Sequence, residues 1–569
     1  MIKSLEGDSQ VLLEVKGLSK RYGETNITAL DSIDLSLEEG EILGIVGESG
    51  AGKTSLLRIL RGVERFDGGV IRFNGLQLGP ESSEGEFLEY QKQTAIQLQR
   101  SFGLWPDSAL DNVVRALRYV EIAEETMPQN EGELQEYRER AMEVLKVVGL
   151  EKRAELWSQV LSGGEKQRLI VARQIARKPK LLLLDEPGTM TDPKSRDDLV
   201  EALRNARDTY HISIVFASHN PQIHRALADR AILLEGGKVK DQGKTEKILD
   251  EFLSGLEKPL PSVKIEGPVV LRMVGVSKLY ELFDYGKVFE LAETSLDFRR
   301  GEIVGIVGPS TAGKTVILRM LAGLELPDRG EVLLIHKGEW VTMGKFGRKS
   351  LHARTHIGIL HQEFDLPYWG RVLDLFAARL GIKDYKMMED ALKRAKQVGI
   401  REEIVDALSR AAEMNDADMS AKLREVGLER EVIKELFRSK DPEAAKDVAL
   451  TALHEMGLGP EILERYVYQL SGGEKIRTAL ALALVFNPKV LILDEPFGDL
   501  DPITLRRISN SLKRVKASFR PAIIVVSHQL DFVEEVADRC VLLVEGRVIM
   551  VGSPSEVIKR FMEGAGNKV

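Results

Sequence analysis

The chain has 569 residues, of which 43% are hydrophobic and 30% are charged, and its formal net charge is -8. One hydrophobic core does not support this length, so we expect two large domains. The sequence pI of about 5.8 argues against a basic surface, and we expect no specific nucleic-acid partner. The single cysteine, Cys540, lies in an apolar stretch. It excludes a disulfide framework, a cysteine-ligated iron–sulfur cluster and a structural zinc site held by this chain alone.

The hydropathy pattern of the sequence predicts neither a secretory signal nor a membrane span. The first residues lack an apolar core segment, and the longest apolar runs, such as 479–486, are far shorter than the roughly 20 residues that cross a bilayer. We therefore expect a cytoplasmic protein, which is compatible with docking on a membrane-bound partner.

The chain repeats itself. The octet Gly47-Glu-Ser-Gly-Ala-Gly-Lys-Thr54 returns as Gly308-Pro-Ser-Thr-Ala-Gly-Lys-Thr315, and the hexapeptide that begins at Leu161 returns at Leu470. Later motifs follow in the same order in both halves. A repeat of this size predicts two copies of one domain.

The boundary between the copies follows from helix and breaker signals. A helical pattern at 245–256 is followed by two prolines within 257–262, which block its continuation. We place the first domain at 1–256, a linker at 257–267 and the second domain at 268–569.

Short β-branched and leucine-rich runs alternate with helical segments in each copy. In the first copy the expected strands include 42–46, 181–184 and 212–216. Such apolar runs are typical of strands that are buried on both faces of a largely parallel sheet, which needs helices to cover it. The pattern predicts an α/β fold.

The two glycine-rich octets are candidate phosphate-binding loops. Each follows an apolar strand pattern and precedes a helix, so backbone N–H groups at a helix N-terminus can surround the phosphates of ATP. Lys53 and Lys314 would place positive charge at the β and γ phosphates, and Thr54 and Thr315 would offer hydroxyl groups to Mg²⁺. A glycine turn that only caps a helix does not account for two such octets, so we predict nucleotide binding.

Paired carboxylates end a later apolar run in each copy, at Asp185-Glu186-Pro and Asp494-Glu495-Pro. We predict that Asp185 and Asp494 hold Mg²⁺ through water and that Glu186 and Glu495 are general bases for the attacking water. Neighbouring side chains on a strand point to opposite faces, but this constraint relaxes at a strand end. A solvated acidic turn is the alternative for one such pair, and two pairs in register disfavour it.

A Ser-Gly-Gly triplet precedes a helical pattern in each copy, at 162–164 and 471–473, and predicts a second phosphate-binding turn. The order of glycine-rich loop, glutamine, Leu-Ser-Gly-Gly, Asp-Glu and histidine resembles the ATP-binding cassette (ABC) family over nearly the whole chain. The resemblance implies two tandem P-loop NTPase domains, each with a mostly parallel sheet core, an antiparallel β part and a helical subdomain. It also implies head-to-tail sites, in which 471–473 close over ATP on Lys53 and 162–164 close over ATP on Lys314.

The resemblance assigns further roles by motif position. Tyr22 and Tyr280 match the aromatic residue that stacks on adenine, and Gln99 and Gln362 match the glutamine loops. His219 and His528 match the histidines that contact the γ phosphate, and the resemblance gives them a catalytic role beside Glu186 and Glu495. The predicted nucleotide-contacting residues are Tyr22, Gly47, Gly50, Gly52, Lys53, Thr54, Ser55, Gln99, Ser162, Gly163, Gly164, Tyr280, Gly308, Gly313, Lys314, Thr315, Val316, Gln362, Ser471, Gly472 and Gly473. The predicted magnesium ligands are Thr54, Gln99, Asp185, Thr315, Gln362 and Asp494.

The copies depart from the family pattern in different ways. The D-loops of the family match 188–193 and 497–502. The first has Thr191 where Leu is usual but keeps Asp192, and Ile476 stands where the first copy has the polar Gln167. Since both glutamates and both histidines are present, we expect both sites to hydrolyse ATP to ADP and phosphate.

The second copy carries an insertion. The offset between the copies is 263 residues at Gln362 and 309 at Ser471, a difference of 46. The extra sequence, at about 383–450 and centred on 402–440, has the spacing of amphipathic helices. It is a candidate docking element for a partner, and a solvated helical decoration is the alternative.

Three classes of coupled partner compete. A translation factor of the family would carry a charged helical linker between its cassettes or a cysteine-rich iron–sulfur domain, and neither is present. The ATP-hydrolysing subunit of a membrane transporter with a separate permease stays possible. The tandem cassettes, the stretch Asp185-Glu-Pro-Gly-Thr-Met190 and the insertion resemble the ATP-dependent activator of the methyl-coenzyme M reductase system of methanogenic archaea. That resemblance implies reductive activation of the enzyme's nickel tetrapyrrole, with the reductase and its activation complex as partners.

Overall fold

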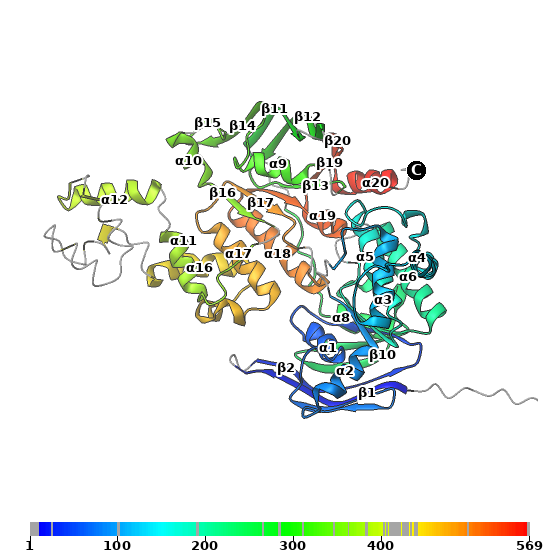
Figure 1. Ribbon diagram of the computed structural model, residues 1–569. Coiled ribbons are helices and arrows are strands. Elements are labelled where there is room, and N and C mark those ends of the chain that lie inside the picture. Colours follow the sequence, from blue (N-terminus) through cyan, green and yellow to red (C-terminus); the bar gives the residue numbers. More distant parts are fainter. Residues whose placement is uncertain are drawn as a thin grey trace, which may run out of the picture. The chain divides into compact units, whose positions relative to one another are not determined.

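The computed structural model describes residues 11–23, 27–98, 103–188, 193–263, 267–282, 286–309, 312–344, 347–361, 364–381, 385–401, 404–405, 408, 423, 432, 435–436, 442–497 and 500–565. Packing divides the chain into two units, Met1–Leu256 with Asp499–Thr504, and Glu257–Gly498 with Leu505–Val569. Each unit combines an antiparallel four-stranded sheet with a mostly parallel six-stranded sheet and flanking helices (Figure 1). The predicted α/β fold with two tandem P-loop domains is confirmed.

The first unit contains ten described strands and eight described α-helices. Its strands are β1 (Val11–Tyr22), β2 (Ile27–Glu38), β3 (Ile42–Val46), β4 (Gly68–Phe73), β5 (Leu76–Leu78), β6 (Thr94–Gln97), β7 (Leu181–Asp185), β8 (Ser213–Ala217), β9 (Arg230–Glu235) and β10 (Lys238–Lys244). Its helices are α1 (Lys53–Leu60), α2 (Glu84–Lys92), α3 (Ala109–Ile122), α4 (Glu131–Val147), α5 (Gly163–Ala176), α6 (Pro193–Tyr210), α7 (Pro221–Leu227) and α8 (Thr245–Leu253), with a short 3₁₀ helix at Glu151–Arg153.

The second unit repeats this order. Its described strands are β11 (Val269–Leu282), β12 (Gly286–Arg299), β13 (Ile303–Val307), β14 (Arg329–His336), β15 (Glu339–Thr342), β16 (Ile357–Leu360), β17 (Val490–Asp494), β18 (Ala522–Val526), β19 (Arg539–Val544) and β20 (Arg547–Gly552). Its described helices are α9 (Lys314–Leu321), α10 (Arg348–Arg354), α11 (Val372–Gly381), α12 (Tyr385–Gln397), α16 (Pro442–Glu455), α17 (Gly472–Leu484), α18 (Pro502–Ser518), α19 (Leu530–Val536) and α20 (Pro554–Ala565), with 3₁₀ helices at Pro460–Glu464 and Val467–Gln469.

The strand order of the larger sheets determines which loops meet. It is β10-β9-β3-β8-β7-β6 in the first unit and β16-β17-β18-β13-β19-β20 in the second. Apart from the antiparallel edge strands β10 and β20, neighbouring strands are parallel. The carboxyl ends of parallel strands share one edge of a sheet, so the residues that follow β3, β8 and β7 are brought together there.

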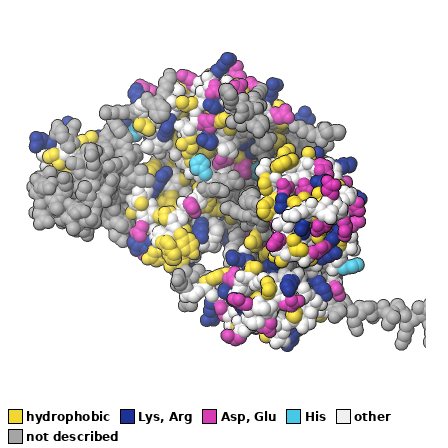
Figure 2. Space-filling model, viewed as in Figure 1, with side chains coloured by type: hydrophobic (Ala, Val, Ile, Leu, Met, Phe, Trp, Pro, Cys, Tyr) yellow, Lys and Arg dark blue, Asp and Glu magenta, His cyan; other side chains and the backbone are white. Residues whose placement is uncertain are grey.

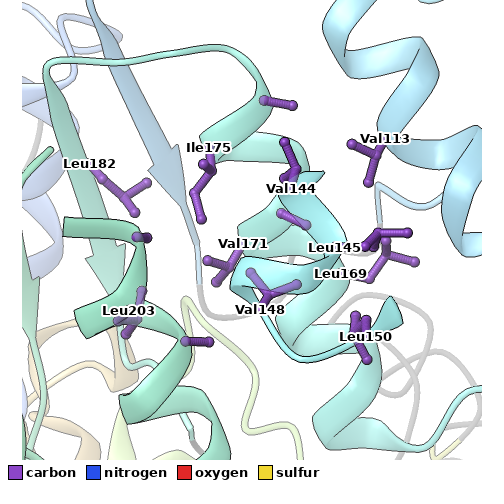
Figure 3. Packing of buried hydrophobic residues seen from close by; sticks show 14 of the residues in the cluster. Val113, Val144, Leu145, Val148, Leu150, Leu169, Val171, Ile175, Leu182 and Leu203 are labelled. Carbon is purple, nitrogen blue, oxygen red and sulfur yellow. The ribbon is translucent and has the colours of Figure 1, made fainter. Parts of the chain in front are cut away.

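Both faces of the central sheet are covered, which explains its continuous apolar strands. All five residues of β3, β7 and β8 are buried. In β7, Leu182 and Leu184 join one apolar cluster with α3 to α6, and Leu181 and Leu183 join the cluster on the other face with α1 and the antiparallel sheet. Figure 3 shows the first cluster, in which Val113, Val144 and Leu169 point toward one another from three helices. A fully buried side chain of this size contributes about 1.5–3 kcal/mol relative to its exposed state.

The segment that follows the first unit lies along α18. Asn510 is 2% exposed; its side-chain nitrogen donates to Glu257 and to the carbonyl oxygen of Lys258, and its side-chain oxygen accepts from the N–H group of Leu260 at 2.9 Å. Lys513 donates to the carbonyl oxygen of Leu260 at 2.9 Å. The first half of the predicted linker is therefore bound to the second unit through buried polar side chains.

The insertion has an apolar cluster of its own. Helix α12 lies in the predicted range and α16 begins in it, whereas most of 402–440 lies outside the described residues. Ala391 and Ala395 of α12 pack with Val405, Leu408, Leu423 and Leu436. The inserted residues thus bury part of their apolar surface against one another.

Cys540 is inert by position. It is the second residue of β19, fully buried, and burial raises the pKa of its thiol to about 12. Because the thiolate is the reactive form, we expect iodoacetamide at pH 8 to leave the native protein unlabelled and to label it after denaturation, as measured by intact mass. Rapid labelling of the native protein would contradict the buried placement.

The surface carries both signs of charge. Lys and Arg side chains alternate with Asp and Glu side chains on the face of each unit that Figure 2 shows, as expected for a chain with a modest net charge. Every helix in the described part of the chain is too short or too polar to cross a bilayer.

Candidate functional site

The glycine-rich loop of the first unit leads from β3 into α1. Lys53, the first residue of α1, is buried and donates to the carbonyl oxygens of Gly47 and Glu48 at 2.9 and 3.0 Å. These bonds curl the loop around the lysine Nζ atom. Glycine is required at the end of the loop, because Gly52 has φ 101° and a Cβ atom there would lie 2.5 Å from the carbonyl oxygen of Ala29.

The second loop has the same construction. Lys314 donates to the carbonyl oxygens of Gly308 and Pro309, both at 2.9 Å. Burial lowers the pKa of Lys314, which the carboxylates of Glu495 and Asp494 counteract. Each loop thus holds a desolvated cation against its own backbone, beside the paired carboxylates.

Glu186 and His219 lie in contact at the carboxyl ends of β7 and β8. Their closest atoms, Nδ1 of His219 and Oε2 of Glu186, are 2.8 Å apart, and the N–H group of His219 donates to the same oxygen at 3.2 Å. Burial acts to raise the pKa of Glu186, but the charge and hydrogen bonds of His219, together with the charge of Lys53, leave that pKa lowered. The carboxylate is therefore ionised in a largely buried position.

The left-handed backbone of Glu186 explains how two consecutive carboxylates reach one site. Asp185 is the last residue of β7, and Glu186 has φ 53° with its N–H group bonded to the carbonyl oxygen of Ala217. Glu495 repeats this with φ 51°. A non-glycine residue in this region is strained, and the recurrence in both units points to a functional constraint.

The equivalent pair in the second unit uses the other ring nitrogen. Nε2 of His528 lies 3.0 Å from Oε1 of Glu495. Burial acts to raise the pKa of Glu495, and the hydrogen bond and charge of His528 lower it overall. The His528 side chain is 34% exposed, against 12% for His219, so the two pairs differ in solvent access.

Oxygen ligands of the kind that Mg²⁺ prefers lie together beside each loop. The hydroxyl group of Thr54 donates to Asp185 at 2.9 Å, and that of Thr315 donates to Asp494 at 3.4 Å. Burial raises the pKa of both aspartates, so a bound cation would stabilise their charged form. The donor set fits Mg²⁺.

The two tyrosines predicted to stack on adenine sit at the ends of β1 and β11. The hydroxyl group of Tyr22 lies 3.1 Å from that of Ser55 in α1, and the ring of Tyr22 is exposed. The hydroxyl group of Tyr280 donates to Glu325, and burial followed by that bond raises its pKa to about 12. Tyr22 is thus close to its phosphate-binding loop. The ring of Tyr280 lies near that of Phe289, with 6.1 Å between the ring centroids.

Each Ser-Gly-Gly triplet forms the N-terminus of a helix. Ser162 caps α5 by accepting from the N–H group of Glu165, while the carboxylate of Glu165 accepts from the N–H group of Ser162 at 2.8 Å. Ser471 and Glu474 form the same capping box at α17. Both serines are exposed, as a surface for an incoming phosphate requires.

Several predicted residues lie outside the described part of the chain. They include both glutamines, Gln99 and Gln362, and the first D-loop residues Thr191 and Asp192. In the second D-loop, Asp501 accepts from Thr504 at 2.9 Å at the start of α18.

One histidine near the second site had not been predicted. The charge of His361 lowers the pKa of Asp494, against a larger opposing effect of burial. Leu98 holds the matching position in the first unit. The only sequence signal was the place of His361 directly before Gln362.

Comparison with known proteins places this site in a family. The model of the ABC transporter family matches residues 30–189 and 291–498. An uncharacterised ABC transporter ATP-binding protein of Methanocaldococcus jannaschii is 42% identical over 562 residues, which cover 97% of each chain. A second such protein of that organism is 31% identical over 98% of each chain. The chain therefore belongs to the ATP-binding cassette family, and its two units are ABC domains.

More distant relatives share the two-domain organisation. The peptidoglycan transport ATP-binding protein YejF of Agrobacterium fabrum is 25% identical over 97% of this chain and 94% of its own. Among solved structures, an archaeal ribosome recycling factor in complex with the stalk protein aP1 matches 97% of this chain and 92% of its own, with a TM-score of 0.54 and 21% identity. This last likeness concerns the fold alone.

Proposed function

We propose that the protein binds two molecules of ATP and hydrolyses them to ADP and phosphate. One observation carries the proposal. In both units an ionised glutamate and a histidine pair within 3.0 Å at the carboxyl ends of strands that neighbour the phosphate-binding loop. A carboxylate in this position accepts the proton of the attacking water, and the histidine orients the carboxylate and contacts the γ phosphate.

The remaining groups position the substrate. Lys53 and Lys314 exchange loop carbonyl oxygens for phosphate oxygens, and the loop N–H groups bind the phosphates. Thr54 with Asp185, and Thr315 with Asp494, would hold Mg²⁺, which neutralises phosphate charge when bound. Gln99 and Gln362 complete the proposed magnesium ligands.

We further propose that the two sites are composite and head to tail, as the family resemblance implies. ATP on Lys53 would be closed by Ser471, Gly472 and Gly473, and ATP on Lys314 by Ser162, Gly163 and Gly164. The capped, exposed helix ends at both triplets support this arrangement, because they present N–H dipoles and a hydroxyl group to an anion.

The partner that ATP binding drives is proposed to be methyl-coenzyme M reductase with its activation complex. The support is the resemblance of the tandem cassettes, the first Asp-Glu-Pro-Gly-Thr-Met stretch and the insertion to the activator of that system. ATP closure would then assist a low-potential electron transfer that reduces the enzyme's nickel tetrapyrrole. Such coupling requires the partner to bind the two states of the ATPase with different affinity.

A transporter role is the second candidate. The relative from Agrobacterium fabrum is named for peptidoglycan transport, and a separate permease would supply the membrane span. Affinity purification from the native cell, followed by mass spectrometry, distinguishes the two. We expect the reductase complex; recovery of a permease in its place would overturn the reductase assignment.

Removal of the insertion is expected to abolish partner binding and to leave ATP hydrolysis intact. The whole of 385–441 should be replaced by a short glycine–serine linker. A cut at 400 would instead remove Leu436 and expose the apolar residues Ala391 and Ala395 of α12, which pack in the same cluster. The measurements are phosphate release and co-purification. A shortened chain that hydrolyses ATP and still recovers its partner would show the insertion to be a solvated decoration.

A further inference from the structure

A cavity of about 480 Å³ lies in the first ABC domain, away from the phosphate-binding loop. Its walls come from α5, from the turn after α3 and from the segment that follows Gln99. The lining residues are Gly103, Leu104, Trp105, Glu125, Ile170, Arg173, Gln174 and Arg177. None of the ATP-binding roles assigned above uses these side chains.

One carboxylate already binds the two arginines of this cavity. NH2 of Arg173 donates to Oε2 of Glu125 at 2.6 Å, and NH2 of Arg177 donates to Oε1 at 2.7 Å. The indole N–H group of Trp105 donates to Oε2 at 2.7 Å. Burial acts to raise the pKa of Glu125, and the bond from Trp105 with the charges of the arginines lowers it overall. The geometry is that of a carboxylate-binding site.

The arginines retain capacity that Glu125 does not use. Arg173 is only 7% exposed, and the buried Nε atoms of Arg173 and Arg177 have no hydrogen-bond partner within the described residues. Burial lowers the pKa of Arg173, the charge and hydrogen bond of Glu125 oppose that effect, and the charges of Arg177 and Arg115 add to it. Two guanidinium groups face one carboxylate, so the lining has a net positive charge and would gain from a further anion.

The second ABC domain shows that the fold does not require these arginines. When Ser162 and Ser471 of the two Ser-Gly-Gly triplets are aligned, Leu482 stands for Arg173 and Phe486 for Arg177. Leu482 belongs to α17 and Phe486 follows it, so the same helix ends without either cation. A structural role common to the two domains is thereby excluded, and a role confined to the first domain is favoured.

We propose that this cavity binds a carboxylate ligand, whose oxygens engage Arg173 and Arg177 while Glu125 is displaced as an internal substitute. Trp105, which is 42% exposed, forms the flat wall of the site and reports its occupancy. In the sequence, 103–105 follow Gln99 by a few residues, and α5 begins at the first Ser-Gly-Gly triplet. A bound carboxylate would touch α5, the helix whose N-terminus is capped by Ser162.

The test uses the full-length protein with citrate as a free carboxylate and a glutamate-rich peptide as the analogue of an acidic partner side chain. Glu125→Gln keeps the shape but removes the competing charge, and we expect it to bind a probe at least about ten-fold more tightly than the wild type, a difference of about 1.4 kcal/mol. Calorimetry measures affinity, and the ¹⁵N indole resonance of Trp105, assigned with Trp105→Phe, should shift on binding.

The first matched control replaces Arg173 by Leu, the residue that the second domain has at the aligned position. Glu125→Gln combined with Arg173→Leu should lose the gain in affinity and the shift of the Trp105 resonance, while Arg173→Lys should retain part of both. Binding of citrate assigns the site to a small molecule, and binding of the peptide alone assigns it to a partner protein. If Glu125→Gln binds neither probe, or if Arg173→Leu binds as well as its parent with an unchanged melting temperature, the proposal is wrong.

Discussion

Replacing both Glu186 and Glu495 by glutamine should abolish ATP turnover and leave ATP binding intact. Glutamine keeps the size of the side chain and its ability to bond with histidine, but it cannot accept a proton from water. General-base catalysis typically contributes about 10²–10⁴-fold, and loss at both sites removes it entirely. Phosphate release measures turnover, and equilibrium dialysis with labelled ATP measures binding.

The single variants separate the two sites. The Glu495–His528 pair is more exposed than the Glu186–His219 pair. We therefore expect Glu186→Gln alone and Glu495→Gln alone to reduce turnover by different amounts. The doubly substituted protein should also elute as one closed, ATP-loaded species. Turnover of the double variant at the wild-type rate would refute the assignment of these glutamates as bases.

Substitutions in the loops and triplets should reveal which halves share an ATP molecule. If Ser471 closes over ATP on Lys53, then Lys53→Ala with Ser471→Arg damages one site only, and the double variant retains the activity of the Lys314 site. Lys53→Ala with Ser162→Arg damages both sites, and turnover should fall to background. Residues that act on one ATP are non-additive, whereas residues of independent sites add.

The reciprocal pairs, Lys314→Ala with Ser162→Arg and with Ser471→Arg, provide the matched control. They should give the opposite order of activities. Stoichiometry of bound ATP, measured on the same four proteins, distinguishes a lost site from a slowed one. Equal loss in all four combinations would contradict the head-to-tail pairing.

The motif-bearing strands were predictable because local sequence specifies them. The apolar runs at 42–46 and 181–184 became β3 and β7, since a strand covered on both faces must be apolar throughout. We also predicted that both side chains, Asp185 and Glu186, could reach one site because the alternation of side-chain direction relaxes at the end of the strand. The left-handed backbone at Glu186, which brings the two carboxylates to one site, was not predicted, because glutamate has no preference for that conformation.

Contacts between distant residues without a motif were beyond sequence reasoning. Glu125 meets Arg173 across 48 residues, and nothing in the spacing of either residue identifies the pair. The choice of ring nitrogen, Nδ1 in His219 and Nε2 in His528, likewise depends on side-chain rotation. The roles of Gln99 and Gln362 stay predictions, because both lie outside the described residues.

The capping boxes at Ser162 and Ser471 bear on how much of the binding energy of ATP is available for closure. Each box fixes the serine hydroxyl group and the first turn of its helix through bonds to Glu165 or Glu474. The conformational entropy of these groups is lost during folding, before any nucleotide arrives. Preorganisation of this kind would leave more of the phosphate interaction available for the proposed closure. The first turns of α5 and α17 are therefore held in their anion-binding form by Glu165 and Glu474.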